Sequence, residues 1–163
     1  MKRVNQEELS WIEQKSPSGK FCVYRKHVSL ALGGLKDVGT FGGGHPFDAE
    51  LTRVPPGAAN WPFHSHDAQW ELFLVLAGRG ELRTLTENLP ITSGDYVLFP
   101  PGEAHQLTNI GDDDLIYYIV SDQPRADVMY YPDSDKYFVK PRRKYFRMQE
   151  VDYFAGEDED PAS

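Results

Sequence analysis

Four residues in the middle of the chain could together bind a metal ion: His64, His66, Glu71 and His105. His64 and His66 are separated by one residue, so on an extended strand both imidazoles point to the same face. Glu71 begins the apolar run Glu-Leu-Phe-Leu-Val-Leu-Ala, where a buried carboxylate is costly unless it binds a cation or another partner. Three neutral imidazoles and one carboxylate would suit a borderline divalent ion.

Each of these residues also has a simpler interpretation. A single histidine is usually exposed or hydrogen-bonded within the fold, and we interpret His27 and His45 in that way. The lone cysteine, Cys22, excludes an intramolecular disulfide and is expected to be a small buried residue. The metal hypothesis therefore depends on the patterns that surround the four candidate ligands.

The elements that must position these ligands are short β-strands. Segments rich in β-branched, aromatic and leucine residues recur between Pro46 and Ser121, each bounded by Gly, Pro, Asn or Asp. Such regular spacing without helical periodicity indicates an all-β sandwich or barrel. The predicted strands are 21–24, 28–32, 47–54, 71–77, 81–86, 96–99, 105–109 and 115–120, with a helical turn around 7–13.

The glycine-rich stretch 39–44 lacks the lysine and the following helix of a phosphate-binding loop, and we expect a flexible loop at the mouth of the barrel. After Pro124 the chain is aromatic and irregular, which favours a segment that packs on the barrel or on a second subunit. The basic stretch from Lys140 to Lys144 is interpreted as a surface segment that could contact the acidic C-terminal tail.

A longer pattern surrounds the first three candidate ligands. Gly57 precedes His64-Ser-His66, four residues separate His66 from Glu71, and six residues separate Glu71 from Gly78. This order resembles the first motif of the cupin superfamily, which has a glycine, a short spacer, His-x-His, three or four residues, a glutamate, six residues and a glycine. The spacer after Gly57 is one residue longer than the usual pattern, and loop spacers of this kind vary in length.

The second cupin motif is matched at every spacing. Gly94 is followed by Pro100 and Gly102, then by His105 and Asn109. We expect the Pro-Pro-Gly turn to deliver His105 to the ligand cluster and Asn109 to tie the strand end to a neighbouring loop. Gly78 and Gly94, which bracket the segment between the motifs, are expected at tight bends.

The resemblance implies a double-stranded β-helix, or jelly-roll cupin barrel, with short peripheral helical segments. The barrel would span 46–121, with N-terminal strands and a loop (1–45) and an aromatic extension (122–155) packed on it or on a partner, and a mobile acidic tail (156–163). It also implies one divalent transition metal, either Zn, Mn, Fe or Ni, at the base of an open pocket, and a homodimer.

Function follows less directly, because cupins with the same ligands catalyse unrelated reactions. We favour an enzyme that acts on a small oxygenated substrate, such as a sugar or sugar-phosphate isomerase or epimerase. The alternatives are an iron-dependent dioxygenase, a decarboxylase of small acids, and a non-catalytic module that binds or senses a small ligand. Tyr96, Tyr118 and Arg53 are candidate catalytic residues, and an inward Arg53, Arg79 or Arg83 would select an anionic substrate.

Charge and hydropathy restrict the partners. The net charge is −8, and most of it comes from six acids between Glu150 and the C-terminus, where no lysine or arginine occurs. A nucleic-acid-binding surface is therefore not expected. No apolar run is long enough to cross a bilayer and no signal-peptide pattern is present, so we predict a cytoplasmic protein with no membrane partner.

Overall fold

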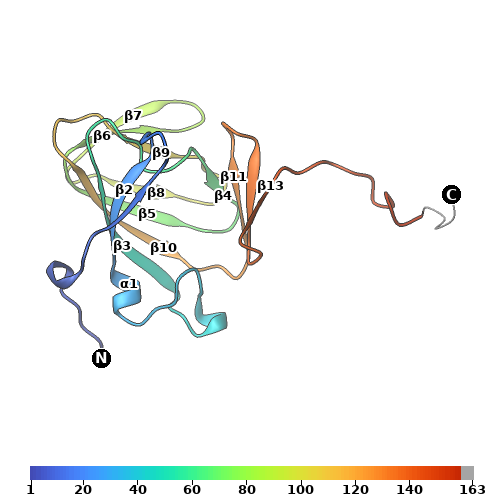
Figure 1. Cartoon of the computed structure of the whole chain (residues 1–163), viewed down its shortest axis with the longest axis horizontal. Coiled ribbons are helices and arrows are strands. Elements are labelled where there is room, and N and C mark those ends of the chain that lie inside the picture. The colour runs from blue at the N-terminus through green and yellow to red at the C-terminus, as the bar shows by residue number, and fades with distance from the viewer. Residues whose placement is uncertain (159–163) are drawn as a thin grey trace.

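The structure is a computed structural model that describes residues 1–158, and its barrel is built from three sheets (Figure 1). The six-stranded sheet has the order β1-β2-β3-β10-β5-β8, the four-stranded sheet β13-β12-β11-β4, and the three-stranded sheet β7-β6-β9. The strands are β1 (Ile12–Lys15), β2 (Cys22–His27), β3 (Phe47–Val54), β4 (Ser65–His66), β5 (Glu71–Ala77), β6 (Arg79–Arg83), β7 (Asn88–Thr92), β8 (Tyr96–Phe99), β9 (Gln106–Asn109), β10 (Leu115–Asp122), β11 (Asp127–Tyr131), β12 (Lys136–Lys140) and β13 (Lys144–Phe146). The helical segments are η1 (Gln6–Glu8), α1 (Val28–Ala31) and η2 (Thr40–Gly42).

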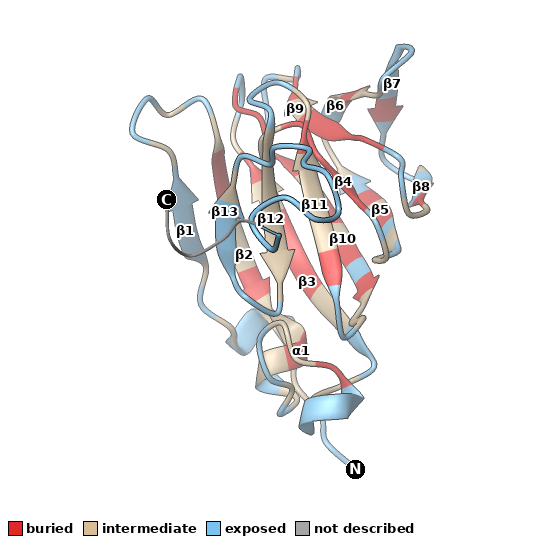
Figure 2. Ribbon diagram, turned by 90° about the vertical axis from the view of Figure 1, so that its right-hand side faces the viewer, coloured by how far each residue is buried: buried red, intermediate tan, exposed pale blue. Residues whose placement is uncertain are grey.

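Alternation along the strands separates the interior of the barrel from its outer face. On β5, Phe73 and Val75 are buried whereas Leu72 and Leu76 are exposed. Buried residues alternate with more exposed ones along β5 and β10, and β2 and β3 also contribute buried residues (Figure 2). The predicted all-β jelly-roll fold is thus confirmed, because the period of two places one side of each strand in a shared core.

Aromatic rings fill the core directly below the candidate ligands. The ring of Phe73 stacks on Tyr117 with centroids 5.2 Å apart and meets Phe99 edge-on at 5.0 Å. Phe99 in turn stacks on the imidazole of His105 at 3.9 Å. The packed barrel interior therefore supports one of the candidate ligands from below.

Two motif residues have the structural roles expected from the sequence. Gly78 has a φ of +84°, and a Cβ there would lie 2.5 Å from the carbonyl oxygen of Asp114, so the bend needs a glycine. The side chain of Asn109 donates to the carbonyl oxygens of Val54 and Asp113 at 2.8 and 2.9 Å. Asn109 consequently ties the end of β9 to the loop before β10.

Three sequence predictions differ from the structure. The segment predicted as a strand at 28–32 contains the short helix α1, and the Ser29 hydroxyl there accepts a hydrogen bond from the amide of Ala49. Strands β1, β4 and β7 were not predicted; β1 and β4 are short, and β7 contains Pro90 and has only one buried residue. The chain after Pro124 forms the antiparallel strands β11, β12 and β13 instead of an irregular segment. Of the predicted acidic tail, residues 159–163 lie outside the described residues.

The N-terminal segment packs on the outer face of the six-stranded sheet. The ring of Trp11 lies 4.8 Å from the ammonium of Lys26 and 4.8 Å from the guanidinium carbon of Arg53, and Gln6 contacts Tyr118. This packing covers the part of the face formed by β2, β3 and β10. Across residues 1–158, no helix has the length and apolar character needed to span a membrane.

Candidate metal centre and pocket

The backbone brings the four candidate ligands to one place. His64 and His105 face each other across an isolated antiparallel bridge, in which the His105 amide donates to the His64 carbonyl at 2.8 Å. His66 ends β4, and its carbonyl accepts from the amide of Gly102 at 2.7 Å, so the Pro-Pro-Gly turn is held against β4. Glu71 is the first residue of β5.

Their donor atoms converge on the carboxylate of Glu71. Potential ligand atoms of His64, His66 and Glu71 all lie within 4.8 Å of one another. Nε2 of His105 lies 2.9 Å from Oε2 of Glu71, and Nε2 of His66 lies 4.0 Å from the same oxygen. The four residues predicted from the two motifs thus form a single cluster.

The other nitrogen of each imidazole is held by an oxygen acceptor. Nδ1–H of His64 donates to the Pro62 carbonyl at 2.8 Å, and Nδ1–H of His105 donates to the Glu103 carbonyl at 3.0 Å. Nδ1–H of His66 donates to Oδ2 of Asp127 at 2.6 Å. These bonds fix the ring orientation and leave Nε2 directed at the cluster, which is the arrangement that metal-binding histidines usually adopt.

Burial and mutual charge tune the protonation of the cluster. Burial, with the nearby His105 and His66, lowers the pKa of His64 to about 3. Burial alone would raise the pKa of Glu71, but the hydrogen bond from His105 and the surrounding imidazole charges outweigh it and bring the pKa to about 2. His64 is therefore a neutral donor and Glu71 an ionised one at neutral pH, as metal coordination requires.

Asp127 is a site residue that sequence reasoning missed. Burial by itself lowers the pKa of His66, but the hydrogen bond to Asp127 and the charges of Glu71 and Asp127 raise it above its usual value. Asp127 also accepts from the amide of Ala68 at 2.8 Å. An isolated aspartate 61 positions after His66 carries no sequence signal for this contact, which exists only because β11 pairs with β4.

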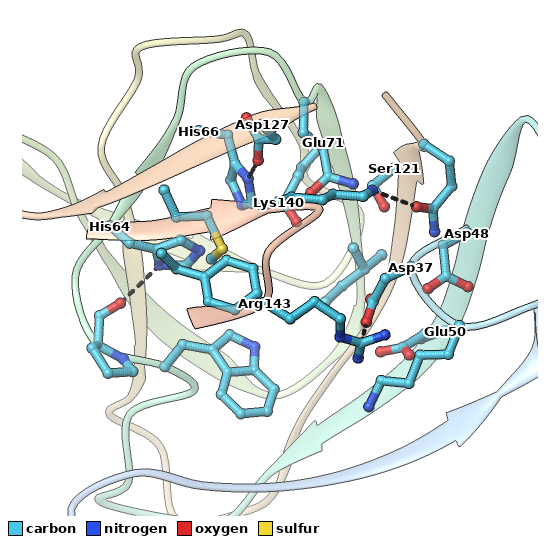
Figure 3. A pocket seen from close by; sticks show the side chains of 18 of the residues that line it. Asp37, Asp48, Glu50, His64, His66, Glu71, Ser121, Asp127, Lys140 and Arg143 are labelled. Carbon is cyan, nitrogen blue, oxygen red and sulfur yellow. Dashed lines mark hydrogen bonds and ion pairs between the residues drawn. The ribbon is translucent and has the colours of Figure 1, made fainter. Parts of the chain in front are cut away.

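Three residues of the cluster, His64, His66 and Glu71, line a pocket of about 640 Å³ whose far walls come from the glycine-rich region and the C-terminal hairpin (Figure 3). Arg143, after β12, forms an ion pair with Asp37 at 2.7 Å, which joins these two walls. The position of Val38 and Phe41 on the pocket wall agrees with the predicted loop at the barrel mouth.

A row of polar side chains crosses the pocket wall. Asp48 on β3 pairs with Ser121 on β10, and Ser121 pairs with Glu71 on β5. All three line the pocket. Burial and the neighbouring Glu50 raise the pKa of Asp48. Glu50 itself accepts from Arg25 at 2.8 Å and contacts Nδ1 of His27, so its charge is paired with the Arg25 guanidinium.

The structure brings none of the three candidate catalytic residues to the pocket. Tyr96 is 70% exposed on the edge strand β8, and the Tyr118 hydroxyl points outward to Gln6. Arg53 lies between the rings of Trp11 and Tyr24 and forms an ion pair with Asp114 at 3.5 Å. Their strand parity places them on the outer face, opposite to Thr52 and Tyr117.

Two further arginines are also absent from the pocket lining. Arg83 forms a two-pronged ion pair with Asp133 at 2.7 Å, and Arg79 lies beside a smaller surface hollow. The cationic residues that do line the pocket are Lys15, Arg25, Lys36, Lys136, Lys140 and Arg143. Two of them belong to the basic stretch that we predicted to be a surface segment. The prediction failed for Lys140 because β12 turns that side chain toward the barrel.

His27, His45 and Cys22 lie outside the metal-ligand cluster and contact other parts of the fold. His27 is hydrogen-bonded to Glu50 and His45 packs near Phe47, so neither belongs to the histidine cluster. Cys22 is buried in the core, as expected. The motifs predicted that His64, His66 and His105 belong to the cluster and that His27 and His45 do not. The geometry agrees with this prediction.

Sequence comparison supports the same family. Residues 50–121 match the family model described as the cupin domain. Over 68 residues the chain is 31% identical to an oxalate-binding protein of Thermotoga maritima, a match that covers 42% of this chain and 55% of that protein. The chain spans about half the length of the curated relatives that it matches.

Similar solved structures cover nearly the whole chain. A proposed sugar phosphate isomerase from Acidithiobacillus ferrooxidans has a TM-score of 0.75 at 20% identity and covers 90% of this chain and 92% of its own. A sugar phosphate isomerase from Silicibacter pomeroyi has a TM-score of 0.73 at 21% identity, with 91% and 93% covered. At these identities the likeness concerns the fold. With the two sequence motifs and the jelly-roll barrel, the family match identifies residues 50–121 as a cupin domain.

Proposed function

We propose that this cupin is a divalent-metal-dependent enzyme that acts on a small oxygenated substrate, as a sugar or sugar-phosphate isomerase or epimerase. The observation that carries the proposal is the convergence of three imidazoles on Glu71 at one end of an open pocket. Each imidazole has its Nδ1 engaged, so its Nε2 is the atom left to bind a metal, and Nε2 of His105 contacts the Glu71 carboxylate.

The donor set fits a transition metal. Three nitrogen donors and one carboxylate suit Zn, Mn, Fe or Ni, and we propose His64, His66, Glu71 and His105 as the ligands. When bound, such an ion would polarise a substrate carbonyl and hold neighbouring oxygens. Asp127 would keep the ring of His66 in orientation, as the outer partners of metal-bound histidines do.

An isomerase also needs a group that moves a proton, and we assign this role to Asp48. Its carboxylate lines the pocket in the same cross-strand row as Glu71, two strand spacings away, or about 10 Å. Its pKa is raised by burial and by Glu50, which suits a carboxyl group that takes up and returns a proton. A small sugar could lie between Asp48 and the histidine cluster.

The relatives support two related candidates. Two structural neighbours are described as sugar phosphate isomerases, which favours the isomerase. The match to an oxalate-binding protein favours a second candidate, a module that binds a small dicarboxylate without turnover. An experiment can separate the isomerase from the binding module, because only the isomerase exchanges a carbon-bound proton of its ligand with solvent.

The experiment is solvent exchange followed by NMR. The protein, loaded separately with Mn, Fe(II), Ni or Zn, is mixed in D2O with a panel of sugars and sugar phosphates. The isomerase predicts deuterium at the carbon beside the carbonyl with at least one metal. The signal should be lost in His105→Ala and in Asp48→Asn, and kept in Asp112→Asn, which alters an exposed carboxylate.

The controls separate the steps. Asp48→Asn should retain its metal, because Asp48 is not one of the proposed ligands, whereas His105→Ala should not. Absence of exchange with every metal and substrate, together with saturable oxalate binding by calorimetry, would refute the isomerase and support the binding module.

A further inference from the structure

Strand β12 directs two ammonium groups into the pocket. Lys136, Phe138 and Lys140 alternate along β12 and all line the pocket, because every second side chain of a strand shares a face. In the four-stranded sheet, β12 is separated from β4 by β11 alone, so the wall it forms lies about 10 Å from the strand that carries His66.

Lys140 is a pocket cation without a salt bridge among residues 1–158, unlike the two arginines nearby. Arg25 is paired with Glu50 at 2.8 Å and Arg143 with Asp37 at 2.7 Å. Nζ of Lys140 instead donates to the neutral side chain of Gln123 at 3.1 Å. Burial lowers the pKa of Lys140, and the charges of Asp37, Asp127 and Asp122 oppose this effect without cancelling it.

The three carboxylates whose charges act on Lys140 each accept a hydrogen bond from another residue. Asp127 is bonded to His66, and Asp37 is bonded to Arg143. Asp122 accepts from the amide of Trp70 at 2.9 Å. The ammonium is thus attracted by these charges from a distance, while its remaining donor positions are available to a ligand.

Two further polar side chains, Ser121 and Gln123, line the same pocket as Lys140, and Gln123 accepts its hydrogen bond. Gln123 follows the end of β10, and Ser121, which is 8% exposed, lies on β10 directly across from Glu71. Figure 3 shows Lys140 extending between His66 and Ser121 toward its dashed contact. The pocket lining thus includes an ammonium, an amide and a hydroxyl, a donor set that matches the oxygens of a phosphate or a carboxylate.

We propose that Lys140, with Ser121 and Gln123, binds an oxyanion group of the substrate, a phosphate or a carboxylate, whose other oxygens lie at the histidine cluster. The inference rests on the proposed function, because it places the substrate in the same pocket. Lys136 has a different setting, with Nζ 4.9 Å from the ring centroid of Tyr131 and 5.5 Å from that of Tyr145. It therefore serves as a comparison within the pocket.

The test is calorimetric titration of the metal-free protein with inorganic phosphate and, separately, with acetate. The wild type should bind at least one of the two saturably, and the better ligand identifies the group. Lys140→Gln should weaken that binding about ten-fold or more, because it removes a charge-assisted contact. Lys144→Gln, on exposed β13 outside the pocket lining, makes the same charge change and should leave binding unchanged.

Several results would overturn the assignment: no binding of either anion by the wild type, undiminished binding by Lys140→Gln, or equal losses in Lys136→Gln and Lys140→Gln. The last would indicate general positive potential instead of a built site. Unchanged thermal unfolding of Lys140→Gln verifies its fold. This titration requires neither metal nor turnover. Anion binding can therefore be observed when the exchange assay is negative, and exchange can be observed when anion binding is absent.

Discussion

Oδ2 of Asp127 accepts a hydrogen bond from Nδ1 of His66 at 2.6 Å, which ties the first strand of the C-terminal hairpin to a proposed metal ligand. Asp127 lies outside the segment 50–121 that matches the cupin family model. The orientation of one ligand of the cluster is thus controlled from beyond that segment, by residues that also form a wall of the pocket.

Replacing Asp127 with asparagine should weaken metal binding and change its pH dependence. The carboxylate raises the pKa of His66, so in the metal-free protein a proton competes with the metal at a pH above the usual histidine range. Affinity should fall as pH decreases through this raised pKa. In Asp127→Asn the competition should begin at a lower pH, and affinity at pH 8 should fall about ten-fold.

Chelator competition between pH 5.5 and 8.5 measures both effects. Asp112→Asn removes an exposed carboxylate far from His66 in sequence and serves as the control. A variant with the wild-type affinity and the wild-type pH profile would show that Asp127 does not act on His66.

The fold and the ligand cluster could be predicted from the sequence because both are encoded locally. His64 and His66 share a face by strand alternation, and the Pro-Pro-Gly turn sets the position of His105. The glycine at position 78 marks a bend that only glycine fits. Each of these signals is carried by residues that are neighbours in the chain, although the Asp114 carbonyl that excludes a Cβ at Gly78 lies on a distant segment.

The rest of the site depends on pairing between distant segments. Asp127 and Lys140 reach the pocket because β11 pairs with β4 and with β12, and nothing in their own neighbourhood indicates that register. The sequence equally could not show that the N-terminal segment covers Arg53 and Tyr118 on the outer face. Short aromatic strands with few alternating apolar residues are the elements whose pairing is hardest to foresee.

Glu50 should limit stability in acid. Burial alone would raise its pKa, but the hydrogen bond from His27 and the pairing with Arg25 lower it below the usual value. Its stabilisation is therefore complete above the unfolded-state pKa of about 4.5 and is lost as pH falls through the lower folded-state pKa. Glu50→Gln should cost about 3 kcal/mol at pH 7 and flatten the acid limb of the stability curve.

Urea unfolding of the metal-free protein from pH 3 to 7 tests this expectation. Glu87→Gln changes an exposed glutamate and should follow the wild type at every pH. If the free energy of unfolding of wild type and Glu50→Gln changed in parallel with pH, the role given to Glu50 and its partners Arg25 and His27 would be contradicted.

Gly78→Ala should destabilise the barrel more than Gly94→Ala. Both glycines have positive φ, so alanine is strained at either position by about 1–3 kcal/mol. At Gly78 the new Cβ would also meet the Asp114 carbonyl at 2.5 Å, whereas the space at Gly94 is open. Equal losses in the free energy of unfolding would show that the close approach at Gly78 is relieved without cost.

Homodimerisation stays a prediction, and the outer face of β5, β8 and β10 is where we now expect it. Leu72 pairs with Leu98 on β8 and with Val120 on β10, and all three are exposed. Leu98→Glu should halve the mass measured by sedimentation, because a buried charge there would oppose association. Leu85→Glu alters a comparably exposed leucine between β6 and β7 and should not. A monomeric wild type would contradict the prediction.

The most direct test of the proposed metal centre is elemental analysis of protein purified without an affinity tag. We predict about one equivalent of Zn, Mn, Fe or Ni per chain. The metal should be lost in His64→Ala, His66→Ala and His105→Ala and retained in His45→Ala, with circular dichroism to verify each fold. Stoichiometric metal in all three cluster variants, or none in the wild type after reconstitution, would contradict the account.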